Sequence, residues 1–187
     1  MPEMFLALTE YGVVGRAFKE KNVDLHLWNP REFSHNEHKT VDDRPYGGGP
    51  GMLMMADPIV KSIRAAKKRQ EGQGLDSGKV IHMSPRGKPL NHKLVNSLVK
   101  EKNLIFIASR YEGIDERVSP WIDEEISIGD FVTSGGEIPT MTLIDCMVRQ
   151  LPGVLNDEES AVQDSFVNGL LDHPHFTRPE IYDGMKV

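Results

Sequence analysis

Residues 104–113 read Leu-Ile-Phe-Ile-Ala-Ser-Arg-Tyr-Glu-Gly, a continuous apolar run that ends in a polar loop. An apolar run of this length, without polar alternation, is typical of a strand that is covered on both faces in a parallel sheet. Residues 79–84 and 125–128 are also predicted as strands, and residues 23–28 alternate like a half-buried strand. The apolar run therefore favours a sheet at the centre of the molecule.

Segments with helical patterns alternate with these strands. The pattern of residues 2–13 opens with Pro2-Glu3, Asp57-Pro58 is predicted to cap a second helix, and Asn91 a third. The predicted helices cover residues 2–13, 57–66, 91–99, 115–121 and 137–151. This alternation predicts an α/β fold with a mainly parallel sheet flanked by helices.

Three polar, glycine-containing loops follow three of the predicted strands. They are residues 84–87, 109–113 and 129–136. Because ligands in such sheets bind beyond the carboxyl ends of the strands, we expect the three loops to form one pocket. Glycines there allow backbone N–H and C=O groups to approach a ligand closely.

The composition excludes several classes of protein. The chain has 187 residues, about the length of a single domain with a small appendage. No apolar run approaches the roughly 18 residues of a membrane helix, and the first residues lack the basic region of a signal peptide. The single cysteine, Cys146, cannot form an internal disulfide, which suits a reducing cytoplasm.

The charge is unevenly distributed along the chain. The formal net charge of −6 argues against a nucleic-acid partner, but residues 61–102 contain 11 Lys and Arg against 3 Asp and Glu, a net charge of +8. Such a stretch can contact phosphate groups, although a solvated helix face explains it as well.

Common nucleotide and metal motifs are absent. The chain has neither G-x-x-x-x-G-K-[ST] nor G-x-G-x-x-G, which excludes the corresponding nucleotide loops. The pairs His35/His38 and His173/His175 lack the companion ligands of a zinc site, so no metal site is predicted. Cys146 lies in an apolar helix and is expected to be inert.

Five segments resemble a known family. They are residues 41–52 (Val-Asp-Asp-Arg-Pro-Tyr-Gly-Gly-Gly-Pro-Gly-Met), 110–117 (Arg-Tyr-Glu-Gly-Ile-Asp-Glu-Arg), 127–137 (Ser-Ile-Gly-Asp-Phe-Val-Thr-Ser-Gly-Gly-Glu), and 164–166 with 173–179 (Asp-Ser-Phe; His-Pro-His-Phe-Thr-Arg-Pro). In this order they closely resemble the bacterial tRNA (guanine-N1)-methyltransferases of the SPOUT superfamily. The resemblance implies a deep trefoil knot, S-adenosylmethionine as methyl donor, tRNA as substrate and an obligate homodimer in the cytoplasm.

The resemblance also implies roles for individual residues. The methyl acceptor is N1 of the guanosine immediately 3′ of the anticodon. Asp164 matches the base that removes the N1 proton, and Arg149 matches the group that stabilises charge on O6. Glu112 lies near the cofactor end of the site. The implied cofactor-binding residues are Pro85, Ser109, Arg110, Tyr111, Glu112, Gly113, Ile128, Gly129, Asp130, Phe131, Val132, Thr133, Gly135 and Gly136.

The active site is implied to be shared between the two subunits of the dimer, with Asp164 reaching a cofactor held by the other subunit. The resemblance does not assign a divalent ion such as Mg²⁺, and it leaves open the roles of Asp42, Arg44 and Arg110. Ser109 replaces a usual glycine, Phe131 a usual tyrosine and Thr133 a usual leucine. We expect these changes to tune cofactor affinity without removing a catalytic group.

The resemblance predicts that residues 1–155 form the cofactor domain and that residues 156–187 form an interdomain linker with the active-site loop. Family members begin with a further apolar strand and continue into a basic tRNA-binding domain. Neither is expected within these 187 residues, so tRNA methylation by this segment alone is expected to be weak or absent. A non-catalytic cofactor- or RNA-binding module, and a hydrolase that uses Asp164 and Glu112, stay open as alternatives.

Overall fold

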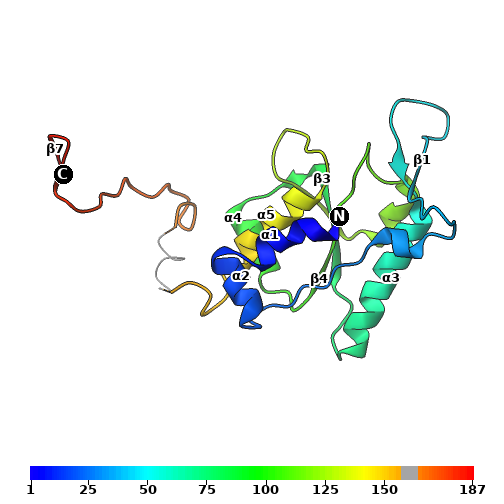
Figure 1. The fold of residues 1–187 in the computed structure, drawn as a ribbon, viewed down its shortest axis with the longest axis horizontal. Coiled ribbons are helices and arrows are strands. Elements are labelled where there is room, and N and C mark those ends of the chain that lie inside the picture. Colours follow the sequence, from blue (N-terminus) through cyan, green and yellow to red (C-terminus); the bar gives the residue numbers. More distant parts are fainter. Residues whose placement is uncertain (157–163) are drawn as a thin grey trace.

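Three parallel strands form the centre of the fold in the order β4-β3-β5. They are β3 (Lys79–Pro89), β4 (Leu104–Ile107) and β5 (Glu124–Ser127). The structure is a computed structural model that describes residues 1–156 and 164–187 (Figure 1). The predicted parallel sheet is therefore confirmed, whereas the trefoil knot stays a prediction.

The middle strand is longer than predicted. Residues 84–87, expected as a loop, continue β3 to Pro89, and the pairing with β5 shifts register between Met83 and Lys88. Gly87 lies so close to β5 that a Cβ atom there would be 2.3 Å from the Ile126 backbone nitrogen. The irregular segment is thus held against β5 through backbone contact, which only glycine permits.

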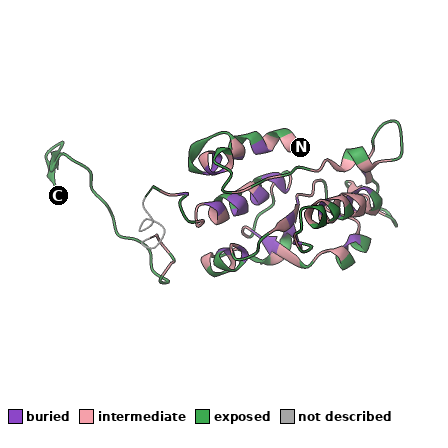
Figure 2. Cartoon of the chain, turned by 90° about the horizontal axis from the view of Figure 1, so that it is seen from below, coloured by how far each residue is buried: buried purple, intermediate pink, exposed green. Residues whose placement is uncertain are grey.

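Helices cover both faces of the sheet, as Figure 2 illustrates by the buried residues along them. Successive residues of β3 point to opposite faces. Val80 packs with α3 (Ala56–Gly72) and η3 (Glu116–Trp121), whereas Ile81 packs with α4 (His92–Leu98) and α5 (Glu137–Val148). The covered faces explain why β4 is apolar throughout.

The N-terminal segment packs against α5. It comprises η1 (Pro2–Phe5), α1 (Leu6–Thr9) and α2 (Gly12–Lys19) instead of one continuous helix. The break falls at Glu10 and Tyr11, where Tyr11 has an extended backbone (φ −126°, ψ 155°), and α2 then starts at Gly12 with a φ of +69°. Phe5 and Val14 of this segment are buried with Val148 of α5.

Two other local predictions were wrong. Residues 23–28 are not a strand; together with β4 they line a cavity of about 730 Å³. Helix α3 begins at Ala56, so Asp57 lies inside its first turn instead of capping it, and its carboxylate accepts a hydrogen bond from Lys61 at 2.8 Å. By contrast, Asn91 does cap α4, since its side chain accepts from the Leu94 N–H at 2.9 Å.

The remaining elements are short. They are η2 (Pro30–Phe33), the antiparallel pair β1 (Asp42–Asp43) and β2 (Leu53–Met54), and the antiparallel pair β6 (Ile181–Tyr182) and β7 (Met185–Lys186). The last pair lies in a largely exposed segment that extends away from the sheet (Figure 1). Among the described residues, no helix combines the length and the apolar character needed to cross a membrane.

Candidate active site

The loops that follow β4 and β5 meet at one backbone contact. The Gly136 N–H donates to the carbonyl oxygen of Ser109 with an N···O distance of 2.6 Å. A Cβ atom on Gly136 would lie 2.9 Å from both the Ala108 Cα and the Ser109 nitrogen. The structure therefore brings residues 109–113 and 129–136 together, and glycine at position 136 is what allows the approach.

A partly buried ion pair links the loop after β4 to the first residue of α5. Arg110 Nε donates to Glu137 Oε1 at 2.7 Å, and the terminal ammonium of Met1 lies 2.9 Å from the same oxygen. Burial alone would raise the pKa of the Glu137 carboxyl, but the hydrogen bonds from Arg110 and the ammonium outweigh it and lower the pKa. Arg110 therefore ties the β4 loop to the start of α5.

The glycine-rich loop over residues 42–52 packs on residues 109–113. Tyr111 donates its hydroxyl to Asp42 at 3.1 Å, and the Glu112 N–H donates to the Met52 carbonyl at 3.0 Å. Gly51 has a φ of +77°, and a Cβ atom there would lie 2.4 Å from Glu112 Cγ. The sequence left the role of this loop open. In the structure it holds Tyr111 and Glu112 in place through these contacts.

The conformation of both loops is unusual. Tyr111 has a φ of +60°, which a bulky side chain rarely adopts, and Gly113 and Gly129 have φ values of +127° and +150°. Strain of this kind persists where surrounding contacts enforce it, and it often accompanies ligand sites. Within these two loops the strain lies at Tyr111, because glycine adopts a positive φ freely, and it marks the loop after β4 as a candidate ligand site.

The other residues implied by the resemblance differ in exposure. Phe131 and Val132 are exposed apolar side chains, and Asp130 is exposed as well. Thr133 donates its hydroxyl to the Gly135 carbonyl at 2.9 Å, which fixes the turn before α5. Ile128 packs against the core between β5 and α5, and Pro85 lies in the irregular part of β3.

Arg149 and Asp164 form a direct pair at the other end of α5. Arg149 Nη1 donates to Asp164 Oδ2 at 2.6 Å, and each side chain is about one third exposed (37% and 32%). Since α5 contains 12 residues, it spans about 18 Å, which separates this pair from Gly136. The predicted cofactor loops thus meet at one end of α5, whereas Arg149 and Asp164 meet at the other end.

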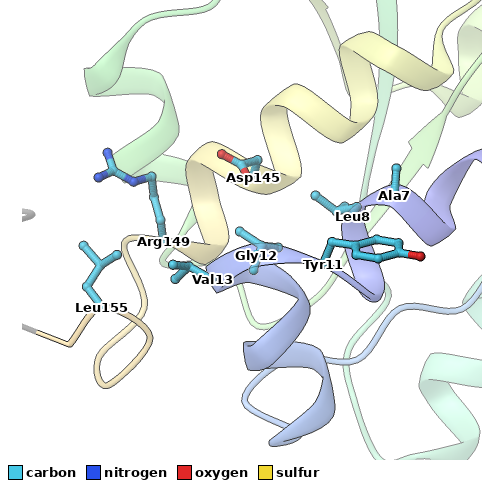
Figure 3. A pocket seen from close by; sticks show the side chains of 9 residues that line it. Ala7, Leu8, Tyr11, Gly12, Val13, Asp145, Arg149 and Leu155 are labelled. Atoms are coloured by element: carbon cyan, nitrogen blue, oxygen red, sulfur yellow. The ribbon is translucent and has the colours of Figure 1, made fainter.

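A small cavity of about 220 Å³ adjoins Arg149. Figure 3 shows Arg149 at the end of α5, Asp145 one turn earlier, Gly12 and Val13 at the start of α2, and Leu155 on the following segment. Tyr11 and Val13 expose apolar surface here. The end of α5 that carries the ion pair is therefore flanked by an apolar surface that is open to another molecule.

Six of the eleven basic residues between positions 61 and 102 contact acidic or aromatic partners within the chain. On α3, Arg64 stacks on Trp121, Lys61 pairs with Asp57 and Arg69 lies 3.4 Å from Asp24. These contacts favour the interpretation of a solvated helix face.

A group of possible metal ligands occurs in the C-terminal segment. Asp172, His173 and His175 offer ligand atoms within 4.8 Å of one another, but all three residues are exposed, and His175 already pairs with Asp172 at 2.7 Å. No companion ligand for His173 and His175 was evident in the sequence, whereas the structure places Asp172 beside them.

Two residues of the site were missed at the sequence level. Glu137 is an acid in the first turn of the mostly apolar helix α5, and His82 lies between the apolar residues Ile81 and Met83 of β3. Both are buried (2% and 3% exposed), and both contact the loop after β4. An isolated polar residue within an apolar element was the available signal.

Comparison with known proteins agrees with this arrangement. The family described as "tRNA (Guanine-1)-methyltransferase TrmD" matches residues 1–187. The tRNA (guanine-N(1)-)-methyltransferases of Janthinobacterium sp. (strain Marseille) and Aeromonas salmonicida are 57% and 58% identical over all 187 residues, which span 75% and 74% of those proteins. The crystal structure of tRNA (m1G37) methyltransferase from Aquifex aeolicus matches with a TM-score of 0.78 at 39% identity, over the whole chain and 76% of that structure. The chain therefore belongs to the tRNA (guanine-N1)-methyltransferases, a family of S-adenosylmethionine-dependent SPOUT enzymes.

Proposed function

We propose that this chain methylates N1 of the guanosine immediately 3′ of the tRNA anticodon, with the cofactor held by Pro85 and by the loops over residues 109–113 and 128–136. Asp164 and Arg149 are assigned to the guanine. The observation that supports this assignment best is the joining of two glycine-containing loops at Ser109 and Gly136. Residues 1–155 would form the cofactor domain and residues 156–187 the linker with the active-site loop, of which residues 157–163 lie outside the described residues.

The loops fit S-adenosylmethionine chemically. Glycines at 113, 129, 135 and 136 let backbone groups approach the adenine edge, and the exposed Phe131 and Val132 offer apolar cover for its ring. Glu112 and Asp130 are accessible acids that suit the positive charge of a sulfonium. When bound, S-adenosylmethionine supplies a methyl group that is already activated for transfer.

The task of the protein is then to align the guanine and to remove a proton. Neutral guanine carries a proton at N1, and Asp164 would accept it as the N1–methyl bond forms. The negative charge that spreads to O6 would be stabilised by Arg149, whose guanidinium already lies 2.6 Å from Asp164. The ion pair orients the carboxylate before the substrate arrives.

The length of α5 supports a site shared between two copies of the chain. Within one chain, the Arg149–Asp164 pair and Gly136 lie at opposite ends of a helix that spans about 18 Å. Methyl transfer requires the acceptor and the methyl group to be in contact. A twofold homodimer that places the Asp164 end of one protomer over the cofactor loops of its partner would complete the site twice. The exposed apolar surface at Tyr11 and Val13 is available for such an interface.

The assignment is tested by methyl transfer from labelled S-adenosylmethionine to unmodified tRNA, followed by nucleoside analysis of the product. We expect slow formation of N1-methylguanosine at the position 3′ of the anticodon, in line with the weak activity predicted for this segment alone. Incorporation at another nucleoside, or at another guanosine, would contradict the proposed acceptor.

The contact between the two loops makes a specific prediction. Gly136→Ala places a Cβ atom against the Ala108 and Ser109 backbone, so the loops must move apart by several tenths of an ångström. Overpacking of this kind costs about 1–3 kcal/mol, and we expect the dissociation constant of S-adenosylmethionine to rise at least tenfold.

Gly72→Ala is the matched control for this change. Gly72 lies at the end of α3, and a Cβ atom added there would meet nothing within 4 Å. It should bind the cofactor like the unsubstituted protein and be equally stable or slightly more so. Calorimetric titration of both variants measures the difference, and equal affinities would contradict the importance of the loop contact.

A further inference from the structure

The most unusual buried group of the sheet is His82 on β3. Its residue is 3% exposed, and both ring nitrogens have partners: Nδ1 lies 2.9 Å from Glu125 Oε1, and Nε2 lies 2.9 Å from Ser109 Oγ. The register places His82 beside Glu125 on β5 and beside Ile107 on β4, two residues before Ser109. The three side chains thus form one hydrogen-bonded row across the carboxyl end of the sheet.

The chemistry of the partners determines the tautomer. The carboxylate of Glu125 can only accept, so Nδ1 must carry the proton that it donates. In the neutral ring Nε2 is then an acceptor, and the Ser109 hydroxyl donates to it. Every member of the row has a defined role as donor or acceptor as long as the imidazole is neutral.

Ser109 is the residue through which the two cofactor loops meet. Its side chain is held by His82, and its carbonyl oxygen accepts from Gly136 at 2.6 Å. A contact that fixes the Ser109 hydroxyl therefore also fixes the Ser109 carbonyl, which sets the distance between the two loops. This inference rests on the cofactor site proposed above.

We propose that Glu125, His82 and Ser109 form a relay that positions the two cofactor loops and thereby sets the affinity for S-adenosylmethionine. His82 and Glu125 are positioning residues that act on the cofactor site only through Ser109. The relay works in the neutral state of His82, because a protonated ring would donate from both nitrogens and force the Ser109 hydroxyl to reverse its direction.

The surroundings of His82 favour that neutral state. Burial lowers the pKa of His82 most strongly, Glu125 opposes the shift, and the charge of Arg86 adds to it. The charged groups around the ring are Glu125 on β5, Arg86 on β3 at 3.6 Å from Glu125, and Glu116 on η3 at 3.5 Å from Arg86. The unfolded chain binds a proton at His82 below its ordinary pKa of 6.5, whereas the folded chain binds it only at lower pH. Stability is thus fully present above pH 6.5 and decreases as the pH falls through the folded pKa.

The relay is tested first by ¹⁵N nuclear magnetic resonance of the histidine rings in the cofactor-free protein at pH 7.5. We expect His82, assigned by its loss in His82→Gln, to be neutral and protonated at Nδ1. A ring protonated at Nε2 alone, or at both nitrogens, would overturn the relay whether or not the cofactor site is correct.

The second test is calorimetric titration of S-adenosylmethionine into variants of the whole 187-residue chain. Ser109→Ala and His82→Gln should each raise the dissociation constant about tenfold, and the double variant should be no weaker than either single variant, since one contact is lost in all three. Ser109→Thr retains the hydroxyl and should restore affinity. His92→Gln, on the surface helix α4, is the control that should bind normally.

The pH dependence separates positioning from general loss of structure. Affinity of the unsubstituted protein should fall as His82 becomes protonated below pH 6.5, whereas Ser109→Ala should show a flatter profile. Normal binding by Ser109→Ala and His82→Gln would overturn the relay alone. No binding by the unsubstituted protein would overturn the proposed cofactor site, and with it the relay's function.

Discussion

Replacing Asp164 with Asn is expected to reduce the rate of methyl transfer to tRNA by about 10³-fold. Asparagine retains the shape of the side chain and can still accept a hydrogen bond from Arg149, which lies 2.6 Å away in the unsubstituted protein. What it lacks is the basicity needed to take the proton from guanine N1. Single-turnover transfer of a labelled methyl group measures the rate of the chemical step itself.

Cofactor binding is the internal control for this variant. Asp164 lies at the far end of α5 from Gly136 of its own chain and is not assigned to the cofactor, so Asp164→Asn should bind S-adenosylmethionine normally. Arg149→Met should retain cofactor binding as well and lose about 10²-fold in rate, because it removes the charge that stabilises O6. Methyl transfer by Asp164→Asn at the unsubstituted rate would exclude Asp164 as the base. Cofactor binding without any transfer by the unsubstituted protein would favour the non-catalytic module.

Mixing two inactive variants is expected to restore activity. Asp164→Asn retains intact cofactor loops, and Gly136→Val, in which a bulkier side chain meets the Ala108–Ser109 backbone, retains an intact Asp164. If the site is shared, a dimer with one chain of each kind contains one site with both functional halves. After random exchange of equal amounts, about a quarter of all sites should be active.

The complementation distinguishes a shared site from a site within one chain. Each variant alone, after the same denaturation and refolding step, gives the background. A mixture that stays at the background, while the mixed dimer is shown to form by mass spectrometry, would place both halves of each site in the same chain.

Much of the fold follows from local sequence patterns. The apolar run at Leu104–Ile107 predicted a strand covered on both faces, and helices do cover both faces of the sheet. The strand predicted at residues 23–28 failed for a non-local reason: alternation shows that a segment can pair, but not that a partner lies within reach. The sequence did not predict the continuation of β3 through residues 84–87, because Pro85 and Gly87 favour a turn. These residues fit into the strand here because β5 lies close to Gly87.

The site residues likewise fall into those that a local sequence pattern predicts and those that it does not. The glycine-containing loops after β4 and β5 were predictable, because parallel strands present such loops at one edge of the sheet. Asp164 and Arg149 were visible only through resemblance, since a single acid in an acidic segment carries no local signal. The ties that hold the loops, Arg110 to Glu137 and His82 to Ser109, span 27 residues each and depend on strand register, which no local pattern encodes.

Calorimetric titration of S-adenosylmethionine into the 187-residue protein tests the central claim most directly, because it examines the cofactor loops without requiring tRNA. We expect saturable binding of one cofactor per chain, weakened at least tenfold by Gly136→Ala and unchanged by Gly72→Ala. No heat of binding at any accessible cofactor concentration, from a protein shown to be folded by its cooperative thermal unfolding, would contradict the assignment of these loops to the cofactor.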